Sequence, residues 1–133
     1  MELPTYDQFM LPLLKLAAED GQVHSIAPLR EKLAQQFGIT PEQRSIKLPS
    51  GQQSVFDNRV GWASTYLRKA GLLSRPKRGY IQITQRGRDV LAENPSAIDN
   101  LYLQRFEEFR EFRERSAPEE TIAATPSDTS APT

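Results

Sequence analysis

Apolar residues recur at helical spacing through the middle of the chain, between positions 55 and 71. Successive members of this series are four or three residues apart, which places them on one side of a helix: Phe56, Val60, Ala63, Leu67 and Ala70. Gly71 follows directly, in the position where glycine commonly ends a helix. The spacing therefore predicts a helix with one buried side, and the rest of the chain is expected to support it.

The opposite side of this predicted helix carries small and hydrogen-bonding side chains. At 100° per residue its members are Asn58, Gly61, Trp62, Thr65, Arg68 and Lys69. The only acid of the segment, Asp57, is expected to lie to the side. Asparagine can pair with adenine, arginine with guanine, and a threonine methyl can touch thymine in the major groove of DNA. Such a face is suited to reading base edges.

Two short β-favouring segments follow the helix, at residues 72–74 and 80–83. The turn between them is basic and contains Arg75, Lys77 and Arg78. A helix followed at once by a hairpin with a basic tip is typical of a winged helix-turn-helix, in which the helix enters the major groove and the hairpin meets the backbone. The predicted fold is mainly α with a small β-hairpin wing, and this DNA-binding domain is expected to span residues 1–95.

The segments before the central helix predict its support. Thr5 and Gln8 have the spacing of a capping box, so a first helix should begin near Tyr6 and be distorted at Pro12. A second helix should run from its cap at Ser25 to Gly38, and a short capped turn should follow at residues 40–43. After the hairpin, a further helix is expected between residues 84 and 94.

Residues 96–116 predict one long C-terminal amphipathic helix. Its apolar stripe consists of Ile98, Leu101, Tyr102, Phe106, Phe109 and Phe112. This stripe needs a covering surface, which is expected to be the first helix or, in a homodimer through residues 97–115, a second copy of the chain. Residues 117–133 are rich in Pro, Thr, Ser and Ala and predict a disordered linker.

Composition narrows the class of protein. The 133 residues include no cysteine, which rules out disulfides and thiolate metal sites. The longest apolar stretch, Phe9 to Leu14, contains Pro12 and is too short to cross a membrane. The net charge is zero, but residues 47–88 contain nine Lys or Arg against one Asp. The basic excess coincides with the predicted helix and hairpin, which favours a nucleic-acid surface over an ordinary solvated face.

The sequence predicts no enzyme site in these residues. His24 is the only histidine and has no acid at a ligand spacing that would favour a metal site, and there is no phosphate loop or nucleophile motif. No metal or cofactor is therefore expected here.

The candidate DNA contacts separate by role. Arg75, Lys77 and Arg78 on the wing are expected to meet phosphates, and Gln52, Gln53 and Ser54 to bind a phosphate near the helix N-terminus. The groove face is expected to consist of Asn58, Gly61, Thr65, Arg68 and Lys69. Trp62 either flanks this face or folds back to pack on the wing or loop.

Several short motifs together resemble the N-terminal domain of Mrr-type restriction proteins. They include Asn58-Arg59-Val60-Gly61-Trp62-Ala63, Ala70-Gly71-Leu72, Arg78-Gly79-Tyr80 and the opening Leu3-Pro4-Thr5-Tyr6. The resemblance covers roughly residues 1–112. It implies a winged-helix domain that binds double-stranded DNA in a host-defence restriction system. It further implies a following Mg²⁺-dependent nuclease that cuts foreign or methylated DNA and is absent from this chain, in a cytoplasmic, nucleoid-associated protein.

Two alternatives remain open from the sequence. A dimeric winged-helix transcription regulator would pair two copies through residues 97–115. A protein-interaction module would keep the winged-helix shape without binding DNA, although the basic central segment argues against this alternative.

Overall fold

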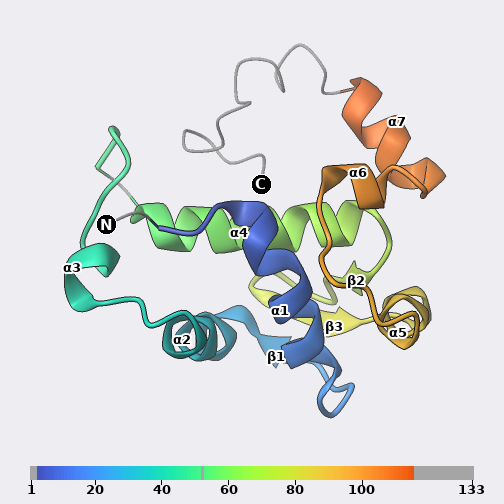
Figure 1. The fold of residues 1–133 in the computed structure, drawn as a ribbon, viewed down its shortest axis with the longest axis horizontal. Coiled ribbons are helices and arrows are strands. Elements are labelled where there is room, and N and C mark those ends of the chain that lie inside the picture. The colour runs from blue at the N-terminus through green and yellow to red at the C-terminus, as the bar shows by residue number, and fades with distance from the viewer. Residues whose placement is uncertain (1–2, 52, 116–133) are drawn as a thin grey trace.

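The computed structural model describes residues 3–51 and 53–115 (Figure 1). Gln52 and the predicted linker at residues 117–133 lie outside the described residues. The elements follow one another as α1 (Tyr6–Ala18), β1 (His24–Ser25), α2 (Ile26–Gln36), α3 (Pro41–Arg44), α4 (Val55–Lys69), β2 (Leu73–Ser74), β3 (Tyr80–Ile83), α5 (Gln85–Ala92), α6 (Asn100–Leu103) and α7 (Glu107–Arg115).

Helices α1 and α4 form the centre of the molecule, where they cross (Figure 1). The predicted capping box of α1 is present, because the Gln8 side chain accepts a hydrogen bond from the Thr5 backbone N–H at 2.8 Å. Pro12 lies inside this helix. Much of α1 is buried, so it supplies core on more than one side: Phe9, Met10, Leu11, Leu13, Leu14, Leu16 and Ala17.

The three strands form one antiparallel sheet in the order β1-β3-β2. Leu73 pairs with Ile83 in the hairpin, and His24 pairs with Ile81 on the other side of β3. Ile81 and Ile83 are buried, because alternate residues of β3 point into the core. This arrangement confirms the predicted winged-helix fold, with the hairpin as the wing.

The prediction of a single C-terminal helix over residues 96–116 is wrong, because α6 and α7 are separate helices. Phe109 and Phe112 on α7 pack against Tyr66 of α4, with ring centroids 5.6 Å and 5.7 Å away. Leu101, which was predicted to belong to the buried stripe, is 77% exposed. Because α6 and α7 are separate helices, the aromatic residues of α7 pack on α4 while Leu101 on α6 stays exposed.

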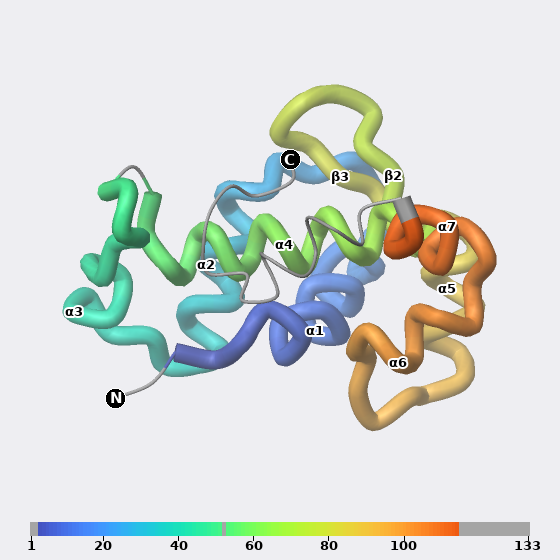
Figure 2. Tube along the Cα trace, turned by 90° about the horizontal axis from the view of Figure 1, so that it is seen from above, coloured from blue at the N-terminus to red at the C-terminus, as the bar shows by residue number. Residues whose placement is uncertain are grey.

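The elements gather at opposite ends of α4. Figure 2 shows α3 near its N-terminal end and α5, α6 and α7 near its C-terminal end, with the β2–β3 wing alongside. Among the described residues, no helix is long and apolar enough to cross a membrane.

Candidate nucleic-acid interface

Helix α4 is the predicted reading helix, and its local sequence fixes where it begins and ends. The Ser54 hydroxyl accepts a hydrogen bond from the Asp57 backbone N–H at 3.0 Å, which caps the N-terminus. Gly71 has a φ of 84°, a left-handed conformation that glycine adopts without strain, and it ends the helix as predicted. Ser54 therefore has a structural role at the position where a phosphate contact was predicted.

The prediction of which side of α4 is exposed is wrong in part. Asn58, Thr65 and Trp62 are buried, with exposed fractions of 1%, 4% and 4%. The prediction assumed one buried side, whereas α4 is enclosed more broadly by α1, the hairpin and α7. Asn58 donates a hydrogen bond from Nδ2 to the Gln53 side chain at 3.3 Å, so it supports the loop before the helix.

Trp62 and Lys69 lie on this covered flank of α4. The Trp62 ring packs edge-on against Tyr66 with centroids 5.5 Å apart, and the Lys69 ammonium lies 5.3 Å from the Phe112 ring centroid. Trp62 was predicted either to flank the groove face or to fold back on the wing or loop; it is buried, but its aromatic partner is Tyr66 of α4. Lys69 was predicted on the groove face, and the structure instead places it against α7.

The exposed stripe of α4 consists of Asp57, Gly61, Ser64 and Arg68, which are only partly buried and follow one another at steps of four, three and four. At 1.5 Å per residue this stripe is about 16 Å long. Gly61 and Arg68 were predicted to belong to it. Ser64 was missed and Asp57 was placed to the side, although the small and polar character of this series is visible in the sequence.

Gly61 is the residue of the exposed stripe that has no side chain. A Cβ built at this residue would have no described atom within 4 Å, so no neighbouring helix requires a glycine here. Glycine inside a helix lowers stability by roughly 0.5–1 kcal/mol relative to alanine. A glycine that costs stability and packs against nothing is suited to close approach by a partner molecule.

Arg68 ends the exposed stripe next to the wing. Partial burial, together with the charge of nearby Arg75, lowers the pKa of Arg68 below its usual value. An arginine nevertheless keeps its charge at neutral pH. Two like charges held close together favour an anion between or beside them. The C-terminal end of the stripe and the start of the wing therefore form one positive surface.

The wing tip, residues 75–79, is exposed throughout. The Lys77 ammonium lies 4.4 Å from the Tyr80 ring centroid, a cation–π distance that steadies the side chain. Gly79 accepts a hydrogen bond from the Ile26 backbone N–H at 2.9 Å, which ties the wing to the start of α2. The structure thus presents Arg75, Lys77 and Arg78 on one exposed turn, as the prediction of backbone contacts requires.

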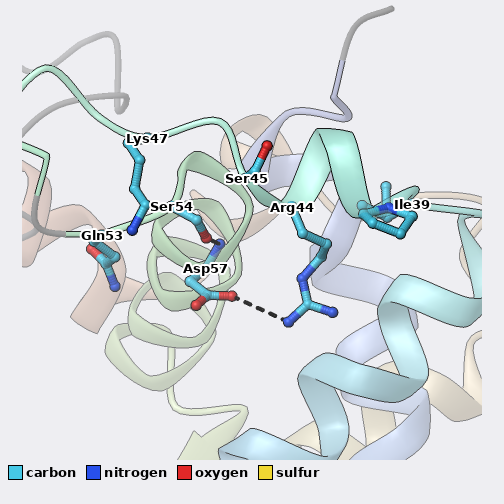
Figure 3. A pocket seen from close by; sticks show the side chains of 8 residues that line it. Ile39, Arg44, Ser45, Lys47, Gln53, Ser54 and Asp57 are labelled. Carbon is cyan, nitrogen blue, oxygen red and sulfur yellow. Dashed lines mark hydrogen bonds and ion pairs between the residues drawn. The ribbon is translucent and has the colours of Figure 1, made fainter.

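An open hollow of about 670 Å³ lies at the other end of the stripe, beside the N-terminus of α4 (Figure 3). Its wall includes Ile39, Pro41, Arg44, Ser45, Lys47, Gln53, Ser54 and Asp57. Of the three residues predicted to bind a phosphate here, Gln53 and Ser54 line the hollow and Gln52 is outside the described residues. Arg44 and Lys47 were missed because they precede the helix by a loop whose path the sequence does not show.

Asp57 is held at this hollow by arginines from two other helices. Its Oδ1 lies 3.6 Å from Nε of Arg30 on α2 and 4.0 Å from a terminal nitrogen of Arg44 on α3. Arg44 also donates two hydrogen bonds to Glu31, at 3.1 Å and 2.9 Å. The bond from Arg44 lowers the pKa of Glu31 below its usual range. The network joins α2, α3 and α4 around one acid of the exposed stripe.

The basic residues outside this interface mostly serve the fold. Arg59 donates hydrogen bonds to the backbone carbonyls of Leu3 and Pro4, both at 3.0 Å. Arg86 donates to the Ala70 carbonyl at 2.9 Å and to both carboxylate oxygens of Glu108. These internal bonds separate structural arginines from those on the stripe and wing.

Within the part of the chain that the structure describes, no group of three or more His, Cys, Asp or Glu side chains could hold a metal ion. The family resemblance implies Mg²⁺ only for a separate nuclease domain.

Comparison with known proteins finds a matching family and a similar enzyme. Residues 6–93 match the family model described as the Mrr N-terminal domain. The chain is also 36% identical over 98 residues to the type IV methyl-directed restriction enzyme EcoKMrr of Escherichia coli (strain K12). These aligned residues make up 74% of this chain and 32% of that relative. The chain thus spans about a third of the length of this relative. No solved structure matches it.

Proposed function

Because the chain belongs to the Mrr N-terminal domain family, we propose that it is the double-stranded-DNA-binding part of a restriction enzyme of this kind. The family resemblance found in the sequence is confirmed by the match over residues 6–93. The observation that supports the DNA-binding proposal is the exposed basic wing, with Arg75, Lys77 and Arg78, which follows the partly exposed stripe of α4.

The geometry supports two kinds of DNA contact. The stripe from Asp57 to Arg68 is the part of α4 available to a major groove, and a reading helix contacts base edges with its N-terminal residues. The wing offers Arg75, Lys77 and Arg78 to phosphates beside the groove. Phosphate contacts supply most of the affinity, whereas the stripe would supply the preference for a sequence.

The activity of a longer protein is a further part of the proposal. The similar E. coli enzyme is described as a methyl-directed restriction enzyme, so a full-length relative of this chain is expected to cut foreign or methylated DNA. Cleavage and its Mg²⁺ requirement would reside in a separate nuclease domain, with the protein in the cytoplasm at the nucleoid. The residues described here would select and hold the DNA.

A fluorescence-anisotropy titration tests the DNA-binding proposal. The chain is titrated into labelled duplexes with and without methylated bases, at two salt concentrations. If about six phosphates are contacted, the logarithm of the association constant should fall with the logarithm of salt with a slope of about −5. Absence of binding at low salt would contradict the proposal and favour a protein-interaction module.

The dimeric-regulator alternative makes a different prediction for assembly. Phe109 and Phe112, which a homodimer through residues 97–115 was expected to share, are buried in a single chain at exposed fractions of 0% and 8%. A monomer is therefore expected in sedimentation at high protein concentration. A dimer whose formation depends on exposed Leu101 would restore the alternative.

A further inference from the structure

Asp57 is an acid in a surface otherwise suited to DNA, and this position requires an explanation. It lies on the exposed stripe at the third residue of α4, and it is the only acid among residues 47–88. A carboxylate at this position repels phosphates, so it weakens any purely electrostatic contact. A group that lowers non-specific attraction on a binding surface is suited to a specific contact.

The carboxylate of Asp57 is held in place and retains an available acceptor. Its Oδ1 is buried against Arg30 and Arg44 and accepts no hydrogen bond within the described residues. The side chain is nevertheless 31% exposed and lines the hollow, so its accessible edge is the one with Oδ2. Figure 3 shows Asp57 opening onto the hollow with Arg44 on one side and Gln53 on the other.

The chemistry of the hollow restricts the group that Asp57 can accept. An anion would meet the carboxylate, and a free cation would meet Arg44 and Lys47 on the same wall. A neutral hydrogen-bond donor avoids both conflicts. In the major groove the neutral donors on base edges are the amino groups of cytosine and adenine, whereas thymine and guanine present acceptors there.

We infer that Asp57 is a specificity-determining residue that accepts a hydrogen bond from the exocyclic amino group of a cytosine or adenine in the major groove. Arg30 and Arg44 are the positioning residues that hold its carboxylate. The hollow provides the space in which the base edge approaches the N-terminal turn of α4. This inference rests on the proposed function, because it assigns one base contact to the DNA-binding surface.

Selection from a randomised duplex pool tests the inference. One pool is prepared with cytosine and a second with 5-methylcytosine in its place, since both bases keep the amino group. The chain and its Asp57→Asn variant select from both pools, and the bound duplexes are sequenced. The unchanged chain should require cytosine or adenine at one position, and the identity of that base distinguishes the two sources. In the variant this requirement should fall by about ten-fold, because an amide offers a donor as well as an acceptor.

Controls separate a base contact from a structural role. Asp89→Asn removes an exposed acid of α5 and should leave every position of the selected sequence unchanged. Loss of the Asp57 ion pairs alone would lower stability without changing one base preference, so denaturant unfolding of both variants is measured alongside. If Asp57→Asn does not fold, the affinity of the unchanged chain is measured for duplexes with each base at the selected position. An affinity that stays the same when cytosine or adenine is replaced by thymine or guanine would overturn the inference.

The outcomes also separate this inference from the proposed function. Binding of the unchanged chain with equal affinity for all bases at every position would overturn the inference and leave DNA binding intact. An Asp57→Asn profile identical to that of the unchanged chain would overturn it as well. Absence of binding to both pools at low salt would contradict the proposed function itself.

Discussion

Arg68 on α4 lies near Arg75 at the start of the wing, close enough for the Arg75 charge to contribute to the lowered pKa of Arg68. This proximity joins two elements that the sequence separates by a glycine and a short strand. It places a positive charge at the C-terminal end of α4 beside a positive charge of the wing.

Reversing two wing charges should weaken DNA binding without regard to sequence. In Lys77→Glu with Arg78→Glu, two exposed cations of the wing become anions. The affinity for all duplexes should fall, and the magnitude of the salt slope should decrease by about 2 if each lysine or arginine had neutralised one phosphate. Anisotropy titrations across a salt series measure both quantities.

A matched control carries the same change in net charge outside the basic segment. Lys15→Glu with Lys32→Glu replaces two exposed lysines of α1 and α2. This control should reduce affinity far less than the wing variant. Equal losses in the two double variants would show that net charge, and not the wing, governs binding.

Gly61→Ala should raise stability and lower DNA affinity together. The new methyl meets no described atom within 4 Å, and alanine favours the helix by about 1 kcal/mol over glycine. The same methyl would stand between the exposed stripe and a closely approaching groove. Urea unfolding gives the free energy of unfolding, and anisotropy gives the affinity. A stabilised variant with unchanged affinity would remove the close-approach role of this glycine.

Two polar positions of α4 should respond in opposite ways, because Ser64 is on the exposed stripe and Asn58 is buried. Ser64→Glu places a negative charge at the centre of the stripe and should abolish detectable binding with little change in stability. Asn58→Ala removes the bond to Gln53 and should cost about 1 kcal/mol of stability. Its sequence preference should stay unchanged; a changed preference would restore Asn58 to the reading face.

The ion pair between Arg86 and Glu108 should make the docking of α7 sensitive to acid. Hydrogen bonds from Arg86 lower the pKa of Glu108 in the folded protein. A carboxyl group with a depressed folded pKa stabilises the fold above its unfolded pKa of about 4.3 and loses that contribution as pH falls through the folded value. Unfolding of the unchanged chain and of Glu108→Gln, measured from pH 7 to pH 2.5, should differ at neutral pH and converge in acid. A difference in unfolding free energy that stays constant from pH 7 to pH 2.5 would contradict a stabilising ion pair between Arg86 and Glu108.

The helices α1 to α5 and the hairpin, with their local ends, could be predicted from the sequence, whereas strand β1 and the division between α6 and α7 were not predicted. Capping boxes at Thr5 and Thr40, the cap at Ser54 and the glycine at position 71 are all present as expected. These features depend on hydrogen bonds between residues a few positions apart, so the local sequence is sufficient to specify them. The wing is similarly local, because its two strands are joined by one short basic turn.

Which face of α4 remains exposed was decided only by tertiary packing. Helical spacing identifies one apolar side, but it does not show that Phe109 of α7, 43 residues later in the chain, packs against Tyr66 and that α7 covers this flank of α4. Because of this packing, Asn58 and Thr65, which were predicted to be exposed, are buried, and the exposed stripe instead contains Asp57 and Ser64. The sequence by itself thus determined most of the elements, the basic segment and the family resemblance, because these rest on local pattern. Which polar side chains remain exposed depends on contacts between distant segments, and only the folded structure supplies them.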